Sequence, residues 1–174
     1  ATSSRGYTYS STGVTGGTLV ASQSYTNDQD TVNEAWVDDD FTSATPGWGF
    51  THFATIQGGI NAVMSSGTVH VAAGDYTEAL DIVGKDVTLR STVPLGAKIL
   101  SPDVLATDFT TSAANKAIVY LNNTNSIIDG FVIDGLSKGN ANYRFYGVAF
   151  YNASGTIQNC TVRNIQDNPF SGAQ

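Results

Sequence analysis

Three consecutive carboxylates, Asp38-Asp39-Asp40, form the densest acidic cluster of the chain and are its first candidate for chemistry. Hard oxygen ligands of this kind suit Ca²⁺. Successive side chains of an extended segment point to opposite sides, so Asp38 and Asp40 would share one side and supply two ligands at most. Asp38 and Asp40 are therefore candidate calcium ligands, and Ca²⁺ is the only cofactor suggested. A solvated turn explains the same cluster more simply.

Aromatic side chains around residues 143–151 form the second group of candidates. Tyr143, Tyr146 and Tyr151 are candidates for a flat platform on which sugar rings stack. Core packing and stacking between repeats are the competing explanation for aromatic residues in such a segment.

The remaining reactive side chains stand alone in the sequence. His52 and His70 are too isolated for a zinc site, and we interpret both as ordinary surface histidines. Cys160 is the only cysteine, which excludes an internal disulfide and a cysteine-rich metal site.

The composition narrows the classes of function. The chain has 174 residues, enough for one domain with a core, and only 13% of them are charged. The net charge is −7 and the eight Lys and Arg residues are scattered singly, so nucleic acid is not expected as a partner. No apolar run reaches the roughly 20 residues that span a bilayer. Scarce Lys with abundant Thr, Ser and Asn favours a secreted, extracellular or cell-surface protein.

The elements that would position these side chains change along the chain. Residues 1–35 are rich in Ser, Thr, Gly and Tyr, which predicts an extended N-terminal arm. Residues 36–174 should form the compact part. Apolar residues at steps of three and four predict a capping helix near 51–66, with Thr51 as N-cap. From Thr68 onward apolar residues alternate in short segments broken by turn residues, which predicts strands.

A sequence repeat predicts how these strands are arranged. Residues 116–130 lie over residues 146–160 without a gap at a spacing of thirty, and this alignment places Asn122 on Asn152 and Ile127 on Ile157. Self-similarity at a fixed period is typical of stacked repeats that bury apolar faces only against neighbours. Two polar insertions, about residues 101–115 and 136–145, should be loops. The sequence therefore predicts an all-β fold, a parallel β-helix or solenoid.

Several of these motifs resemble right-handed parallel β-helix proteins of the pectin-lyase-like superfamily. The resemblance covers roughly residues 36–168. Its motifs are Trp36-Val-Asp38, Phe53-Ala-Thr-Ile-Gln57, Gly67-Thr-Val-His-Val-Ala-Ala-Gly-Asp-Tyr-Thr-Glu78, Val87-Thr-Leu-Arg90 and Gly155-Thr-Ile-Gln-Asn-Cys-Thr-Val-Arg-Asn164. It implies a right-handed β-helix with an N-terminal capping helix, but it is weak for activity because this superfamily hosts lyases, hydrolases, esterases, adhesins and phage proteins.

The resemblance also implies where a polysaccharide lyase would keep its catalytic groups. Such enzymes place acidic calcium ligands and a basic residue on one sheet, and the matching candidates here are Asp129, Asp134, Arg163 and Asp167. Asp129 and Asp134 each precede a glycine, which makes turn roles the stronger explanation. The sequence therefore does not decide whether the protein is an enzyme, and the turn explanation favours a function other than catalysis.

Two classes of function follow from these observations. The first is an extracellular structural protein that polymerises head-to-tail into a filament, sheath or surface layer, with other copies of itself as partners through the C-terminal rung and the N-terminal arm. This interpretation rests on the C-terminal rung, whose apolar side chains need a cover. Further coils of a longer chain would cover the same end. The second class is a lyase-like or glycan-binding adhesin domain acting on acidic polysaccharide.

Overall fold

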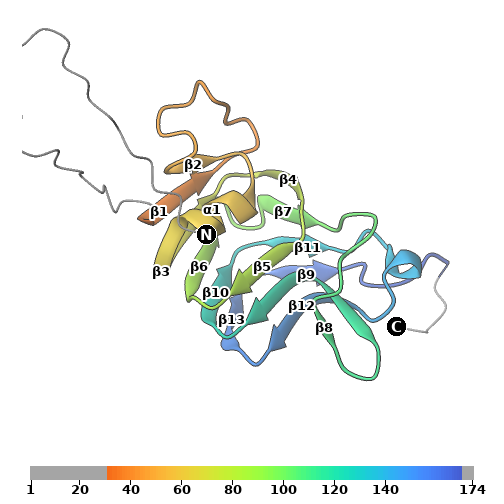
Figure 1. The fold of residues 1–174 in the computed structure, drawn as a ribbon. Coiled ribbons are helices and arrows are strands. Elements are labelled where there is room, and N and C mark those ends of the chain that lie inside the picture. Colours follow the sequence, from red (N-terminus) through yellow and green to blue (C-terminus); the bar gives the residue numbers. More distant parts are fainter. Residues whose placement is uncertain (1–30, 170–174) are drawn as a thin grey trace, which may run out of the picture.

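The computed structural model describes residues 31–169, and in them the protein is mostly β with three parallel sheets, which confirms the all-β prediction (Figure 1). We call the sheets A, B and C. In spatial order, sheet A contains β13 (Ser154–Gln158), β10 (Asn125–Asp129), β6 (Val87–Ser91), β3 (Val63–Val71), β1 (Val32–Val37) and β2 (His52–Phe53). Sheet B contains β14 (Thr161–Arg163), β11 (Val132–Asp134), β7 (Ala97–Leu100) and β4 (Gly74–Thr77). Sheet C contains β12 (Phe145–Tyr151), β9 (Ala114–Asn122) and β5 (Leu80–Val83).

The chain visits the sheets in a fixed cyclic order. From β3 onward each strand of sheet A is followed by one of sheet B and then one of sheet C, except that β8 (Phe109–Thr110) pairs antiparallel with β9 in a hairpin. We call one passage through all three sheets a rung. Equivalent strands of successive rungs pair in parallel, so the main core lies between the sheets and is built from one layer of apolar side chains per rung.

Left-handed backbone conformations turn the corners between the sheets. Asn152 and Asn159 follow β12 and β13 with φ of 52° and 54°, and Asn123 and Gly130 take the same places one rung earlier with φ of 51° and 84°. Asparagine and glycine are the residues that adopt this region at least cost. The repeated asparagines are therefore corner residues.

Between the last two rungs, equivalent residues are 29 apart, as in the pair Val119 and Val148, so the predicted spacing of thirty is wrong by one residue. Ile157 pairs with Ile128, which is fully buried, and not with Ile127, which is 38% exposed. Because the side-chain period of a strand is two, this single step exchanges the inward and outward faces.

The helix predicted near 51–66 is shorter, since α1 spans Ile56–Ala62. Its N-cap is Thr55, whose hydroxyl accepts a hydrogen bond from the Gly58 N–H, whereas Thr51 lies before β2. Ile56 and Ile60 are buried, so α1 covers one end of the core (Figure 1).

The N-terminal arm predicted for residues 1–35 lies mostly outside the described residues. In the part that is described, β1 begins at Val32 and pairs with β3. Ala35 and Val37 alternate with exposed residues and are buried in the core, which explains why this segment is a strand. Within residues 31–169 no helix has the length and apolar character needed to cross a membrane.

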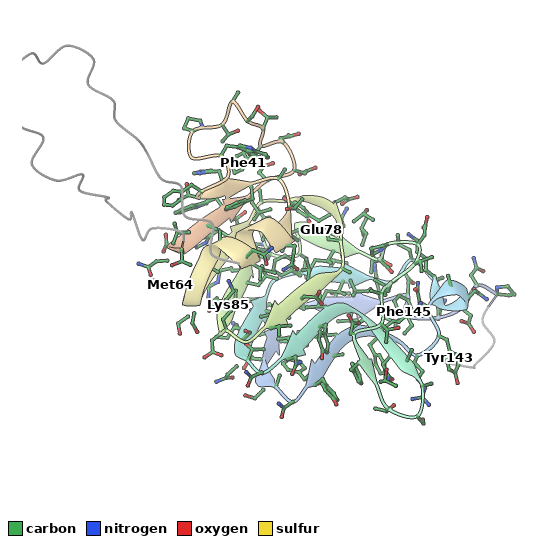
Figure 2. The ribbon with its side chains drawn as sticks, viewed as in Figure 1. Phe41, Met64, Glu78, Lys85, Tyr143 and Phe145 are labelled. Atoms are coloured by element: carbon green, nitrogen blue, oxygen red, sulfur yellow. The ribbon has the colours of Figure 1, made fainter. Side chains whose placement is uncertain are left out.

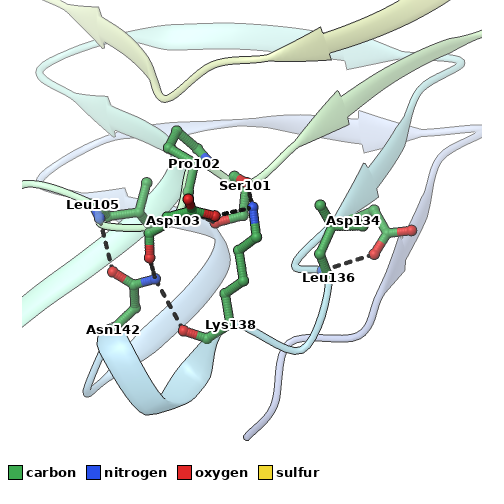
Figure 3. A network of polar contacts seen from close by, with 8 residues as sticks. All are labelled: Ser101, Pro102, Asp103, Leu105, Asp134, Leu136, Lys138 and Asn142. Carbon is green, nitrogen blue, oxygen red and sulfur yellow. Dashed lines mark hydrogen bonds and ion pairs between the residues drawn. The ribbon is translucent and has the colours of Figure 1, made fainter. Parts of the chain in front are cut away.

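The two polar insertions contact each other beside the sheets (Figure 3). Lys138 Nζ donates to the Ser101 carbonyl oxygen at 2.7 Å and lies 2.9 Å from an Asp103 carboxylate oxygen. The buried Asn142 side chain accepts from the Leu105 N–H at 2.8 Å and donates to the Asp103 carbonyl oxygen at 3.1 Å. These bonds, together with the short 3₁₀ helix η1 (Gly139–Ala141), hold the insertions in one ordered layer.

Candidate functional site

The C-terminal rung, residues 145–163, has no neighbour on its outer side among the described residues. Its strands β12, β13 and β14 are each the last strand of their sheet. The side chains that face the core interior from this rung are partly uncovered: Phe150 is 39%, Ile157 38% and Val162 46% exposed. Their partners on the preceding rung are all fully buried, namely Leu121, Ile128 and Ile133.

The same rung lacks the charges that usually protect an exposed sheet edge. Arg163 is the only charged residue in β12, β13 and β14, and its guanidinium is bound to Asp134. Natural edge strands are commonly protected by lysines, prolines, bulges or inward-pointing charges. An apolar face bordered by unpaired strand edges is therefore the most distinctive surface of the described residues.

The opposite end of the stack is closed by side chains. The Gln57 amide forms two hydrogen bonds with the outer edge of β5, accepting from the Asp81 N–H at 2.8 Å and donating to the Asp81 carbonyl oxygen at 3.1 Å. Glu78 accepts from the Ile56 and Gln57 N–H groups at 2.8 and 3.0 Å and so fixes the start of α1 (Figure 2). The two ends of the stack thus differ: polar side chains and α1 lie at one end, and partly exposed apolar side chains lie at the other.

The residues that the resemblance suggested for a lyase lie in several polar clusters. Arg163 Nε is 2.7 Å from the buried Asp134 carboxylate, which also accepts from Asn164 Nδ2 at 2.8 Å and from the Leu136 N–H at 2.9 Å. Burial pushes the pKa of Asp134 upward, but these hydrogen bonds and the charge of Arg163 outweigh it and hold the pKa below its usual value. This cluster joins β11 to β14.

Asp129 and Asp167 occupy other positions. Asp129 ends β10 in sheet A, accepts from Asn159 Nδ2 at 2.8 Å and lies 3.3 Å from Arg90 Nε. Hydrogen bonds from Asn159 and Gln158, and then the charge of Arg90, lower the pKa of Asp129. Asp167 is buried in the segment that follows β14.

The candidate calcium ligands lie in a turn after β1. An Asp38 carboxylate oxygen accepts from the Asp40 N–H at 3.1 Å, so the side chain of Asp38 serves its own turn. Burial, and then the charges of Asp39 and Asp38, raise the pKa of the nearby Tyr76 to about 12. No group of three or more His, Cys, Asp or Glu residues suited to a metal ion occurs in the range 31–169.

Two of the three candidate sugar-binding tyrosines meet at a residue that the sequence analysis missed. Phe109, in the hairpin, stacks on Tyr151 with ring centres 4.6 Å apart and lies 6.3 Å from the ring of Tyr146. The hairpin is held across the outer face of sheet C, where Phe109 packs on Tyr120. Tyr143 is 60% exposed and lies apart at the periphery near η1 (Figure 2).

Two carboxylates accompany this aromatic cluster, and both were missed as site residues. Burial raises the pKa of Asp81, and burial raises the pKa of Asp108 even though Asp108 accepts from the Ala117 N–H at 2.6 Å. Both charges also act on Tyr120, whose pKa is raised, with burial as the largest cause. The aromatic cluster thus has an acidic border.

The isolated histidines are brought together by Trp36 on the outer face of sheet A. His52 and His70 pair with Trp36 from either side, and their rings stack on the indole at 5.6 and 5.5 Å. Alternation alone predicted surface histidines but not this stack, because the pairing depends on the register of three strands.

Comparison with known proteins supplies no relative, since no protein-family model, no curated protein and no solved structure matches the chain.

Proposed function

We propose that this protein is an extracellular structural protein, built as a right-handed parallel β-helix, that assembles with other copies of itself by stacking at the C-terminal rung. The cyclic order of sheets A, B and C, the parallel pairing and the helix at one end support the β-helix. Right-handedness rests on the rule that parallel crossover connections are right-handed in about 98% of cases. The composition, scarce in Lys and rich in Thr, Ser and Asn, supports the extracellular location.

A single observation carries the proposal. Phe150, Ile157 and Val162 continue the interior columns of the core and yet are 38–46% exposed. Covering them with a further layer of β structure would bury apolar surface at roughly 25 cal/mol per Å² and would pair the free strand edges. The sequence analysis predicted head-to-tail growth into a filament, sheath or surface layer; stacking at this rung is the feature that any such assembly requires.

The test places a charge in the uncovered face. Ile157→Lys puts an ammonium at an interior position, and Thr156→Lys puts the same group on the outward face of the same strand as a matched control. In sedimentation velocity and light scattering over a concentration series, wild type and Thr156→Lys should associate and Ile157→Lys should remain monomeric. A wild-type protein that stays a monomer at its highest soluble concentration would contradict the proposal.

A second candidate function is glycan binding at the aromatic cluster of Phe109, Tyr146 and Tyr151. The stacked rings and the acidic border of Asp81 and Asp108 favour it, because sugars bind to flat aromatic faces flanked by polar acceptors. On a glycan array Tyr151→Ala should lose the signal, whereas Tyr143→Ala, which lies apart from the cluster, should keep it. The lyase alternative gains no such support, since the Arg163 guanidinium is engaged by the Asp134 carboxylate.

A further inference from the structure

We infer that the aromatic cluster of Phe109, Tyr146 and Tyr151 binds sugars that carry a protonated amino group, and prefers them to neutral and acidic sugars. The inference rests on the second proposed function, glycan binding at this cluster, and specifies the class of sugar. The sequence alone suggested acidic polysaccharide as the partner of a glycan-binding domain. The charges around the cluster favour a ligand of the opposite sign.

Two carboxylates lie on the same side of sheet C as the aromatic rings. Asp81 in β5 pairs with Tyr120 in β9, so the two side chains are neighbours on the outer face of the sheet. Asp108 directly precedes Phe109 in the hairpin, and its carboxylate accepts from the Ala117 N–H at 2.6 Å. The charge of Asp81 acts on Asp108, and both charges act on Tyr120. Since Phe109 stacks on Tyr120, negative charge borders the cluster directly.

This negative charge has no matching cation in residues 31–169. Neither Asp81 nor Asp108 forms an ion pair within that range. Lys116 acts on Asp108 without pairing with it, because its ammonium donates to the Ala141 carbonyl oxygen at 3.3 Å. Burial raises the pKa of both carboxyl groups, which shows that their ionised forms are incompletely stabilised. A cationic ligand would supply the missing charge.

The aromatic rings strengthen the same preference. The face of an aromatic ring carries partial negative charge and attracts ammonium groups. Tyr146 and Tyr151 are 40% and 41% exposed, so part of each side chain is open to a ligand. An amino sugar offers an apolar ring face for stacking and an ammonium group for the carboxylates. A uronate instead brings a negative charge against both the rings and the carboxylates.

The test compares three oligosaccharides of equal length that share one sugar scaffold. Oligomers of glucosamine, N-acetylglucosamine and glucuronate carry positive, no and negative charge, respectively. Calorimetric titration at about pH 6 keeps the amine protonated and most carboxyl groups ionised. We expect wild type to bind the glucosamine oligomer about ten-fold more tightly than the N-acetylglucosamine oligomer, and the glucuronate oligomer most weakly.

A pair of variants separates the local charge from the net charge of the protein. Asp81→Asn removes one carboxylate of the border, and its side chain forms no hydrogen bond with the described residues that folding would miss. This variant should reduce the preference for glucosamine to less than about three-fold. Glu34→Gln removes the same charge from an exposed position of β1 in sheet A and should keep the full preference.

The outcomes distinguish this inference from glycan binding itself. Equal affinities for the three oligosaccharides, or tightest binding of glucuronate, would overturn the preference and leave glycan binding intact. A preference that Glu34→Gln weakens as much as Asp81→Asn would also overturn it, since net charge would then be the cause. Oligolysine that binds as tightly as the glucosamine oligomer would overturn the assignment to sugars. No binding of any oligosaccharide would overturn both the inference and the glycan-binding function.

Discussion

Asp134 shows how a single buried carboxylate connects one rung to the next. It ends β11, and its three hydrogen-bond donors come from its own turn and from Arg163 and Asn164 on the following rung. A buried carboxylate is costly unless each oxygen is paired, and here both oxygens accept at least one hydrogen bond. The residue is therefore explained by cohesion between rungs, without any catalytic step.

The depressed pKa of Asp134 predicts how stability depends on pH. The pKa in the folded state lies below the unfolded value of about 3.9, so the ionised carboxylate stabilises the fold above about pH 4, and this contribution is lost as the pH falls further. Asp134→Asn should lose about 1–3 kcal/mol of unfolding free energy at neutral pH. In chemical denaturation below pH 4 it should also lose less additional stability than wild type.

Asp75 provides the control for this comparison. It pairs with Lys98 at 2.8 Å on the surface, where both side chains are substantially exposed. Asp75→Asn should change the unfolding free energy by less than about 1 kcal/mol. If wild type and Asp134→Asn lose stability in parallel between pH 5 and 3, roughly the range in which carboxyl groups titrate, the account of Asp134 is wrong.

At the scale of the elements, α1 depends on the rest of the protein for its stability. It has only seven residues, includes Gly58 and Gly59, and has no acidic residue in its first turn. Such a helix is marginal by itself. Glu78, which lies 22 residues from Ile56 in the sequence, supplies the carboxylate at the helix N-terminus.

Removing that carboxylate should therefore loosen the closed end. Glu78→Ala should lower the unfolding free energy by about 1–2 kcal/mol and speed hydrogen exchange at the amides of Gly59 and Ile60. Glu34→Ala, at an exposed position of β1, is the control and should leave both quantities unchanged. Equal exchange rates in α1 for wild type and Glu78→Ala would refute this role of Glu78.

The elements also show what the sequence could and could not predict. Alternation, turn residues and self-similarity were enough to predict parallel strands and their corners. The spacing between rungs was misjudged because two doublets, Asn122-Asn123 and Ile127-Ile128, fit both a spacing of 29 and one of thirty. The strand register and the corner conformation of Asn123, with φ of 51°, select the shorter spacing. The start of α1 was also misplaced, since its N-cap is Thr55 and not the predicted Thr51.

At the scale of the whole molecule, the sequence alone could locate the C-terminal rung but not the aromatic cluster. The uncovered C-terminal rung followed from the repeat, because a stack of rungs has two ends by construction. The aromatic cluster did not, because Phe109 reaches Tyr146 and Tyr151 only through a hairpin folded across sheet C. Contacts that join distant segments are set by the fold and leave no local pattern in the sequence.

The loss of unfolding free energy caused by a core substitution should depend on which rung carries the residue. Two equivalent residues test this expectation. Ile128 and Ile157 pair across neighbouring rungs, but only Ile128 is fully buried, with Ile157 38% exposed. In dilute monomer, Ile128→Ala should cost about 2–5 kcal/mol of unfolding free energy, and Ile157→Ala less than about 1.5 kcal/mol.

Concentrated protein should reduce this difference, because association at the C-terminal rung covers Ile157 and adds stability by mass action. Denaturant unfolding of both variants at a low and a high protein concentration measures the effect. The midpoint of Ile128→Ala should rise with concentration as that of wild type does, whereas the midpoint of Ile157→Ala should rise less because its interface is weakened. Equal costs in dilute protein would show that Ile157 is already covered in the monomer, and the apolar face would then be unavailable for assembly.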